Sequence, residues 1–201
     1  DASVPGMQFD RTVATASMSG GQSLVVNGFG FALNATYRCE LEGVETAPVK
    51  PQSTSVLVCL LPTWDYPLYQ RIAGLRILMQ TSIVPKAGSP MAVRFVPSWF
   101  AVIPSSAPTK GGTMIEVTGG GFEPTSSYTC RFSKGSDEYD VEAFFVQNST
   151  IKCIAPLVSG YTRMSSLAIV DNFGNLLPRY GIPGPSLTEA HFEYMTGWDN
   201  R

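Results

Sequence analysis

Residues 111–122 read GGTMIEVTGGGF, and residues 20–31 read GGQSLVVNGFGF at an offset of 91 residues. The two stretches share a starting glycine pair, two aliphatic positions spaced by two, and a Gly-x-Gly-Phe ending. The match continues without a gap into Tyr-x-Cys, at residues 37–39 and 128–130. Self-similarity at a fixed offset indicates that one structural unit occurs twice.

The repeat also continues beyond these stretches. After an insertion of three residues in the second copy, residues 57–62 (LVCLLP) correspond to residues 151–156 (IKCIAP). We therefore expect two domains, at residues 1–98 and 99–201. Each has an ordinary domain size of about 100 residues.

Apolar residues in each copy alternate with other residues at a period of two, which is typical of β-strands with one face in a core. Leu24 and Val26 form one such set, and Tyr37, Cys39 and Leu41 form another. With 19 Gly, 15 Pro and 15% charged residues, the chain has the dense turn signals of many short strands. The predicted fold class is all-β, with one β-sandwich in each copy.

The four cysteines are Cys39, Cys59, Cys130 and Cys153, two in each copy. The alternation places them on the inward face of their strands, so two buried disulfides are expected. Four cysteines allow three connectivities, and the repeat favours Cys39 with Cys59 and Cys130 with Cys153. Reduced buried thiols and a metal site are the alternatives. The metal site has no help nearby from the single histidine, His191.

Composition and motifs argue against several functions. The formal net charge of -2 offers no basic surface for nucleic acid. No apolar run reaches the roughly 18 to 20 residues of a membrane-spanning helix. The glycine-rich stretches lack the G-K-[ST] of a phosphate loop, so no cofactor is expected. Since His191 has neither a G-x-S-x-G elbow nor a free cysteine to serve, we expect no enzyme activity, although a paired-carboxylate hydrolase stays open.

The second copy resembles the IPT/TIG family, whose domains often read G-G-T-x-[VI]-x-[VI]-x-G-x-x-F, then a cysteine strand, then S-T-x-I-x-C-x-x-P. In the second copy, these three motifs lie at residues 111–122, 128–132 and 149–156, in that order. The first copy departs from the pattern, with Gln22 where the second has Thr113. The resemblance implies two tandem immunoglobulin-like sandwiches of the extracellular branch. It assigns no functional residue, because its motif residues are structural.

Three stretches carry candidate site residues. The sequons Asn34-Ala35-Thr36 and Asn148-Ser149-Thr150 predict N-glycosylation at Asn34 and Asn148 in a secreting eukaryote. Residues 137–142 (DEYDVE) gather four acids, which predict a solvated hairpin end rather than a calcium loop. Residues 171–175 (DNFGN) predict a turn between strands.

A candidate partner-binding segment lies at residues 63–70 (TWDYPLYQ), which is aromatic-rich only in the first copy. Exposed Trp64, Tyr66 and Tyr69 would make a binding hot spot. The alternative is that these rings fold back over the open edge of the sandwich, in which case a buried Trp64 rules the hypothesis out.

Together these features predict a non-catalytic extracellular structural or adhesive module of a larger cell-surface or secreted protein. Its partner would be another protein or the rest of its own extracellular assembly. The connection at residues 96–99 (VPSW) is too short for a free linker, which suits a spacing role. A carbohydrate-binding module, with a glycan as partner, is the alternative.

Overall fold

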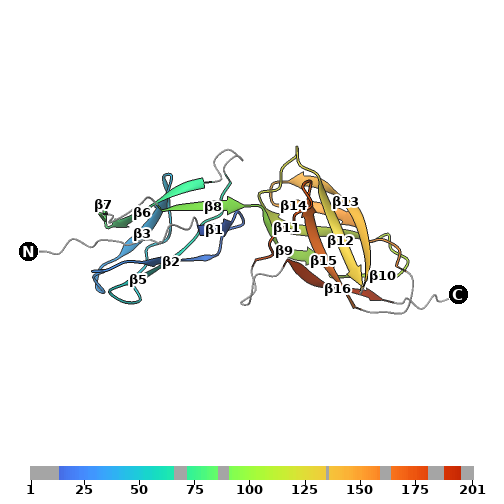
Figure 1. Cartoon of the computed structure of the whole chain (residues 1–201), viewed down its shortest axis with the longest axis horizontal. Helices are drawn as coiled ribbons and strands as arrows, with labels where there is room; N and C mark the ends of the chain where they lie inside the picture. The colour runs from blue at the N-terminus through green and yellow to red at the C-terminus, as the bar shows by residue number, and fades with distance from the viewer. Residues whose placement is uncertain are drawn as a thin grey trace, which may run out of the picture. The chain divides into compact units, whose positions relative to one another are not determined.

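The computed structural model describes residues 14–65, 72–85, 91–134, 136–158, 164–180 and 188–195. All regular elements in these ranges are β-strands (Figure 1), and none of the ranges contains a helix that could span a membrane. The chain divides into two compact units, Asp1–Val96 and Pro97–Arg201, here called domain 1 and domain 2. This boundary lies two residues before the predicted one, because Ser98 and Trp99 begin the first strand of domain 2.

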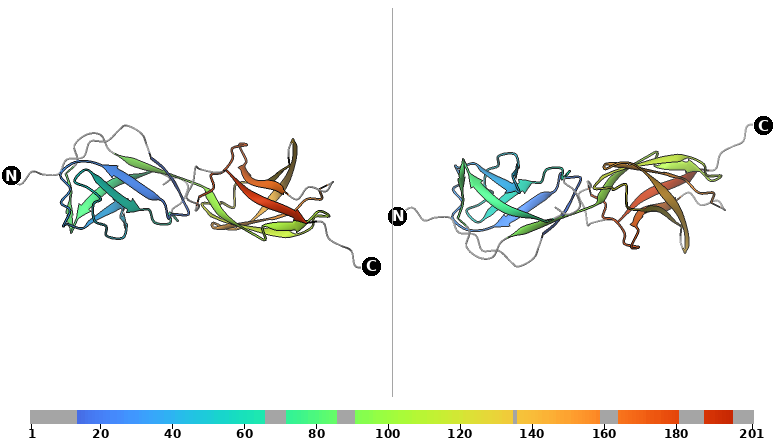
Figure 2. Two further views of the ribbon diagram at one scale, coloured as in Figure 1. Left: turned by 90° about the horizontal axis from the view of Figure 1, so that it is seen from below. Right: turned by 90° about the horizontal axis from the view of Figure 1, so that it is seen from above.

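Domain 1 has two layers of strands (Figure 2). One layer is a six-stranded sheet in the order β1-β8-β6-β3-β4, with β7 paired to β6, and the other is the antiparallel pair β2–β5. The strands are β1 (Ala14–Ser17), β2 (Ser23–Asn27), β3 (Tyr37–Leu41), β4 (Val44–Glu45), β5 (Val56–Leu60), β6 (Ile72–Met79), β7 (Ser82–Ile83) and β8 (Ala92–Val96).

The core of domain 1 follows from the alternation in its sequence. On β2, Leu24 and Val26 are buried while the residues between and beside them are exposed. Strand β3 contributes Tyr37, Cys39 and Leu41 to the same core from the other layer. The predicted inward sets are therefore confirmed, and the cysteines lie among them.

Domain 2 is also a two-layered sandwich, but its strands form one continuous ladder in the order β10-β16-β15-β12-β13-β14-β11-β9. The first part of β13 pairs with β12 in one layer, and its last part pairs with β14 in the other. The strands are β9 (Ser98–Ile103), β10 (Ser106–Pro108), β11 (Met114–Gly120), β12 (Tyr128–Lys134), β13 (Asp137–Gln147), β14 (Thr150–Ile154), β15 (Met164–Asp171) and β16 (Glu189–Met195).

The two domains share hydrogen bonds at corresponding positions outside their strand ladders. In both, the Gly-x-Gly-Phe stretch donates two backbone N–H groups to the turn that precedes the second cysteine strand. The bonds are Gly28 to Ser55 (2.8 Å) and Phe31 to Thr54 (3.0 Å) in domain 1, and Gly119 to Ser149 (2.9 Å) and Phe122 to Asn148 (2.9 Å) in domain 2. The internal repeat is therefore a repeat of structure as well as of sequence.

The starting glycine of each repeat has no room for a side chain. A Cβ on Gly20 would lie 2.6 Å from the backbone N of Thr63, and one on Gly111 would lie 2.7 Å from that of Leu157. Their φ angles are +71° and +72°, in the left-handed region that favours glycine. Backbone crowding and conformation both explain why the repeat keeps this residue.

Candidate binding surfaces

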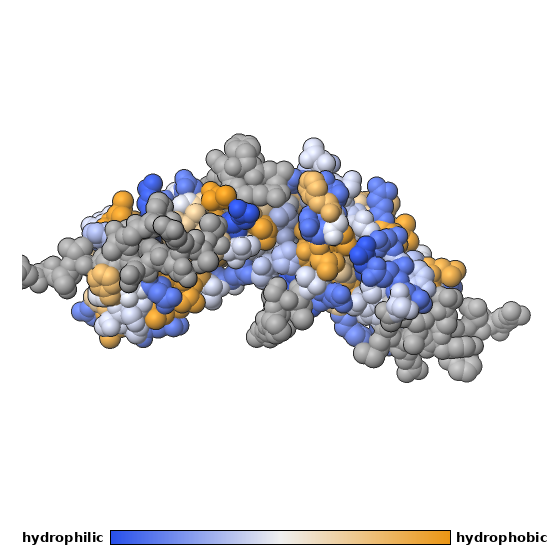
Figure 3. Space-filling view, viewed as in Figure 1, coloured by the Kyte–Doolittle hydropathy of each residue, from blue (hydrophilic) through white to orange (hydrophobic). Residues whose placement is uncertain are grey.

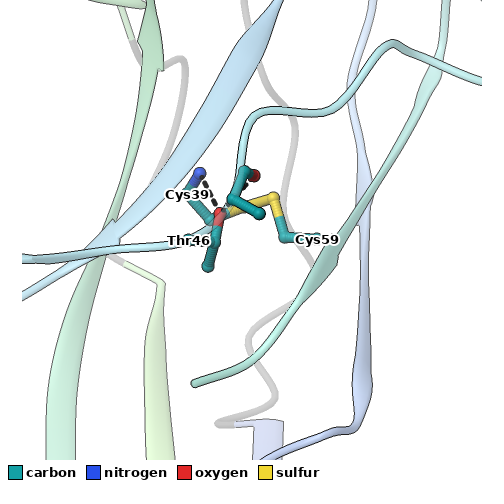
Figure 4. Close-up of a disulfide and its surroundings, with 4 residues drawn as sticks. Cys39, Thr46 and Cys59 are labelled. Carbon is teal, nitrogen blue, oxygen red and sulfur yellow. Dashed lines mark hydrogen bonds between the residues drawn. A yellow bond between two sulfur atoms is a disulfide. The ribbon is translucent and has the colours of Figure 1, made fainter.

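Each domain holds one disulfide in its core. Cys39 is bonded to Cys59 with Cα atoms 6.1 Å apart, and Cys130 to Cys153 with Cα atoms 6.5 Å apart, as the repeat predicts. All four cysteines are fully buried and none is free. Beside the first disulfide, the Thr46 hydroxyl accepts a hydrogen bond from the Cys39 N–H at 3.0 Å (Figure 4). Reactivity requires an accessible thiolate, so these sulfurs serve structure.

The structure overturns the proposed role of Trp64 in partner binding. The side chain is 1% exposed, and its ring stacks on that of Phe95 with centroids 4.2 Å apart. A large apolar ring next to an open core is more stable inside it than in water, so it folds back into domain 1. Tyr66 and Tyr69 lie outside the described residues.

The two sequon asparagines are both exposed and lie in turns. Asn34 lies in the loop before β3, and Asn148 lies in the turn between β13 and β14. The Asn148 carbonyl accepts the Phe122 N–H, so its side chain stays available to solvent while its backbone is held. Glycosylation at Asn34 and Asn148 remains a prediction.

The acidic stretch forms the predicted hairpin, in which β12 and β13 pair from Lys134 and Asp137 onward. The Arg131 guanidinium donates to both Asp140 oxygens at 2.8 Å, and it lies 3.5 Å from Glu138. The hydrogen bond from Arg131 lowers the pKa of the Asp140 carboxyl. An arginine thus neutralises part of the acidic group, and the described residues contain no cluster with the ligands for a metal ion.

Residues 171–175 form the predicted turn, and it presents an aromatic ring to solvent. Asp171 Oδ1 accepts the N–H groups of Phe173 at 2.9 Å and Asn175 at 2.8 Å. Burial opposes ionisation of Asp171, but these hydrogen bonds outweigh burial and lower its pKa. Phe173 at the tip is 80% exposed. The turn therefore holds an apolar side chain outward on a well-bonded backbone.

His191 is exposed on β16, where it lies opposite Ser166 of β15. These are the residue types of nucleophile and base, but they lie on an open sheet face. Backbone N–H groups there bond to the neighbouring strand, so these groups are not available to stabilise an oxyanion. The absence of catalysis stays a prediction.

The outward side of the sheet β9–β11–β14–β13, here called the outer face of domain 2, carries a group of exposed apolar side chains. The apolar members and their exposures are Ile103 (68%), Met114 (50%), Phe144 (52%) and Ile154 (39%). Between them, Lys152 Nζ and the Glu116 carboxylate form an ion pair at 3.2 Å. An outward sheet face is ordinarily polar, so this face is a candidate for contact with a partner.

The corresponding pair in domain 1, β2–β5, also has an apolar outward side, here called the outer face of domain 1. Val25 and Leu60 are about half exposed, while Val56 and Val58 are half-buried. Val25 and Val58 lie opposite each other, where domain 2 has Glu116 and Lys152. In Figure 3, apolar patches interrupt the polar surface of both domains.

Sequence reasoning missed both outer faces, although a signal was present. Residues 56–61 read VLVCLL, an unbroken apolar run rather than an alternation. Such a run indicates a strand that is apolar on both sides. Interpreting only the inward members, Leu57 and Cys59, left the outward ones unassigned.

Several solved structures resemble the chain at low similarity. The plexin A4 extracellular region is 13% identical to this chain, with a TM-score of 0.35. The match covers 83% of this chain and 15% of the plexin chain. A second structure is a Bacteroides ovatus protein of a mixed-linkage glucan utilization locus, solved in complex with a mixed-linkage heptasaccharide. It is 12% identical to this chain, with a TM-score of 0.41, and the match covers 96% of this chain and 46% of that protein. The chain thus spans less than half the length of either. Similarity at this level does not identify a function.

The human nuclear factor of activated T-cells, cytoplasmic 4, has a TIG domain that is 18% identical with a TM-score of 0.36, covering 50% of this chain and 89% of its own. No curated protein matches the sequence. The family model of the IPT/TIG domain matches residues 97–175. The match lies wholly within domain 2, so it is this half of the chain that carries the IPT/TIG assignment.

Proposed function

We propose that this chain is a non-catalytic extracellular binding module that contacts another protein through the outer faces of its two sandwiches, with a structural or adhesive role. The observation that carries the proposal is that both domains expose aliphatic side chains on the same pair of strands, β2–β5 and β11–β14. Exposed apolar surface on a well-folded sandwich favours a protein contact, because burying it is favourable.

The disulfides support an extracellular location. Disulfides form and persist in oxidising compartments such as the secretory pathway and the cell surface, and they are rare in the cytosol. Both bonds lie in domain cores, which suits a permanent structural role. We therefore propose that the module belongs to a secreted or cell-surface protein, and that Asn34 and Asn148 carry glycans where the host glycosylates.

We also propose that domain 1 is a second copy of the IPT/TIG domain. The support is its set of matched backbone hydrogen bonds and its matched ring contact. The Phe31 and Tyr37 rings meet edge to face with centroids 5.4 Å apart, and the Phe122 and Tyr128 rings do so at 5.3 Å. Only one residue, Pro97, separates β8 from β9, and this short connection supports a spacing role between tandem units.

A carbohydrate-binding role is the second candidate, and Phe173 is the observation that favours it. Sugar rings stack on exposed aromatic side chains, and the turn presents Phe173 with the amide side chains of Asn172 and Asn175 nearby in sequence. This role predicts that a Phe173→Ala variant loses glycan binding.

The experiment that separates the two roles applies the labelled, disulfide-intact chain to an array of extracellular protein domains and to a glycan array. The proposed function predicts binding to protein spots that a Val25→Asp variant weakens at least tenfold. Ile83→Asp is the matched control, because Ile83 is a similarly exposed aliphatic residue on β7, away from the outer faces. Binding to glycans alone, abolished by Phe173→Ala, would instead establish the second candidate.

A further inference from the structure

On the outer face of domain 2, each side chain is complementary to the one at the matching position on the other side of the sheet's midline. Strand register aligns Ile103 with Glu116, Glu116 with Lys152, and Lys152 with Phe144. The row therefore runs apolar, acidic, basic, apolar across β9, β11, β14 and β13. The neighbouring row pairs Met114 with Ile154, apolar with apolar.

A two-fold axis lying in this face, parallel to the strands and between β11 and β14, would exchange the two halves of each row. Glu116 of one copy would then meet Lys152 of the other, and Ile103 would meet Phe144. Met114 would meet Ile154 in the same way. In these two rows each charge thus faces its opposite and each apolar side chain faces another, as a self-complementary interface of two-fold symmetry requires. In the third row, Thr118 would meet Thr150, and only the edge position Ala101 would meet a polar residue, Gln147.

From this complementarity we propose that a second copy of this chain binds the outer face of domain 2, forming a two-fold dimer in which the two sheets pack face to face. Sheets that pack in this way keep their strands within about 30° of each other, which a two-fold axis along the strands allows. This inference rests on the proposed function and names the partner for one of its two faces.

The outer face of domain 1 does not meet the same condition. Its rows pair Ser23 with Leu60 and Asn27 with Val56, so a two-fold axis would place a polar group against an aliphatic one. Only the central row, Val25 with Val58, is self-complementary. The inference therefore applies to domain 2 alone.

The size of the face predicts a weak dimer. Four strands about 4.8 Å apart and about five residues long cover a flat area of roughly 300 Å² per copy. A stable interface buries about 800 Å² per partner. The ion pair adds little, because both side chains are well exposed and can exchange partners at small cost. We expect a dissociation constant on the order of 0.1 to 1 mM.

The experiment is sedimentation equilibrium of the full 201-residue, disulfide-intact chain at concentrations up to about 1 mM, combined with charge variants. Glu116→Lys and Lys152→Glu should each weaken self-association at least tenfold, because each places like charges opposite each other across the axis. An equimolar mixture of the two variants should form a heterodimer, in which every charge again faces its opposite. Ile83→Asp should leave association unchanged.

The heterodimer distinguishes the predicted register from a general effect of charge. Phe144→Ser supplies a second variant that removes the apolar part of the face without placing a new charge opposite Lys152. The inference is overturned if the chain remains monomeric at 1 mM, or if mixing the charge variants gives no more association than each alone. A monomeric chain that still binds other proteins on the extracellular array would leave the proposed function standing.

Discussion

Domain 1 and domain 2 share a repeat, but they differ in how their two layers are connected. In domain 2, β13 pairs in both layers, so one hydrogen-bonded ladder runs from β10 to β9. In the described part of domain 1, the pair β2–β5 shares no ladder with the six-stranded sheet. Domain 1 therefore depends more on side-chain packing and on the Cys39–Cys59 bond to hold its layers together.

The corresponding positions Trp64 and Val158 give the largest expected difference between the domains. The Trp64 N–H donates to the Met18 carbonyl, just after β1, at 2.9 Å. The Val158 N–H donates to the Thr109 carbonyl, just after β10, also at 2.9 Å. Trp64→Ala should destabilise domain 1 by about 3 to 5 kcal/mol, because it empties a large buried volume against Phe95. Val158→Ala should cost domain 2 about 2 kcal/mol.

Differential scanning calorimetry of the full chain measures both effects, with each variant shifting only its own domain's transition. If Trp64→Ala leaves both transitions within 1 °C of the parent chain, the ring does not pack in the core, and its role in partner binding would have to be reconsidered.

Removing the disulfides tests the difference in layer connection directly. The bonds close loops of similar length, with sequence separations of 20 and 23, so chain entropy predicts a similar loss of about 3 kcal/mol for each. Because β13 still joins the layers of domain 2, Cys130→Ala with Cys153→Ala should leave a cooperative transition at lower temperature. Cys39→Ala with Cys59→Ala should abolish the transition of domain 1.

Thermal denaturation followed by circular dichroism gives the measurement, and the chain with both disulfides intact is the control. Equal losses in the two domains, with both transitions preserved, would contradict the idea that β13 compensates for the missing bond.

The starting glycines provide a comparison in which the domains should behave alike. Gly20→Ala and Gly111→Ala should each cost about 2 kcal/mol or more, because a Cβ meets backbone atoms at a positive φ. The neighbours Gly21 and Gly112 have open space, so Ala there should cost only about 1 kcal/mol, from the φ angle alone. Unequal losses at Gly20 and Gly111 in thermal melts would show that the repeat is not equivalent in energy.

Sequence patterns predicted most of the fold because inward-facing residues obey a simple rule. Leu24, Val26 and the cysteines step by two, and a buried face tolerates little else. The glycine pairs were equally visible, since left-handed backbone demands them. The passage of β13 between layers left no comparable signal, because it depends on where the strand's partners end.

The candidate sites were harder to predict, for a different physical reason. Composition alone left both an exposed and a buried Trp64 open, because burial of a ring depends on the space that Phe95 and its neighbours leave. The outer face of domain 2 depends on register, because Ile103, Glu116, Lys152 and Phe144 come from four strands. Alternation within a strand predicts which residues point outward but not which of them lie side by side.

The smallest expected effect concerns two corresponding turns, one after β6 in domain 1 and one after β15 in domain 2. Met79 lies opposite Tyr37 and Asp171 lies opposite Tyr128, so the two turns occupy the same place in the repeat. In domain 2, the Asp171 side chain accepts a backbone hydrogen bond within the turn, and the residue with positive φ is a glycine, Gly174 at +83°. In domain 1, the residue with positive φ is Gln80, at +57°. A side chain in this region costs about 1 kcal/mol or more, so Gln80→Gly should stabilise domain 1 by about 0.5 to 1 kcal/mol after its own entropic cost. Urea midpoints of the parent and variant chains measure the gain, with Gln52→Gly as a control at a residue that does not have a positive φ. A loss of stability in Gln80→Gly would mean that contacts of the Gln80 side chain contribute more stability than its backbone strain costs. The glycine of domain 2 would then give its turn no advantage over the turn of domain 1.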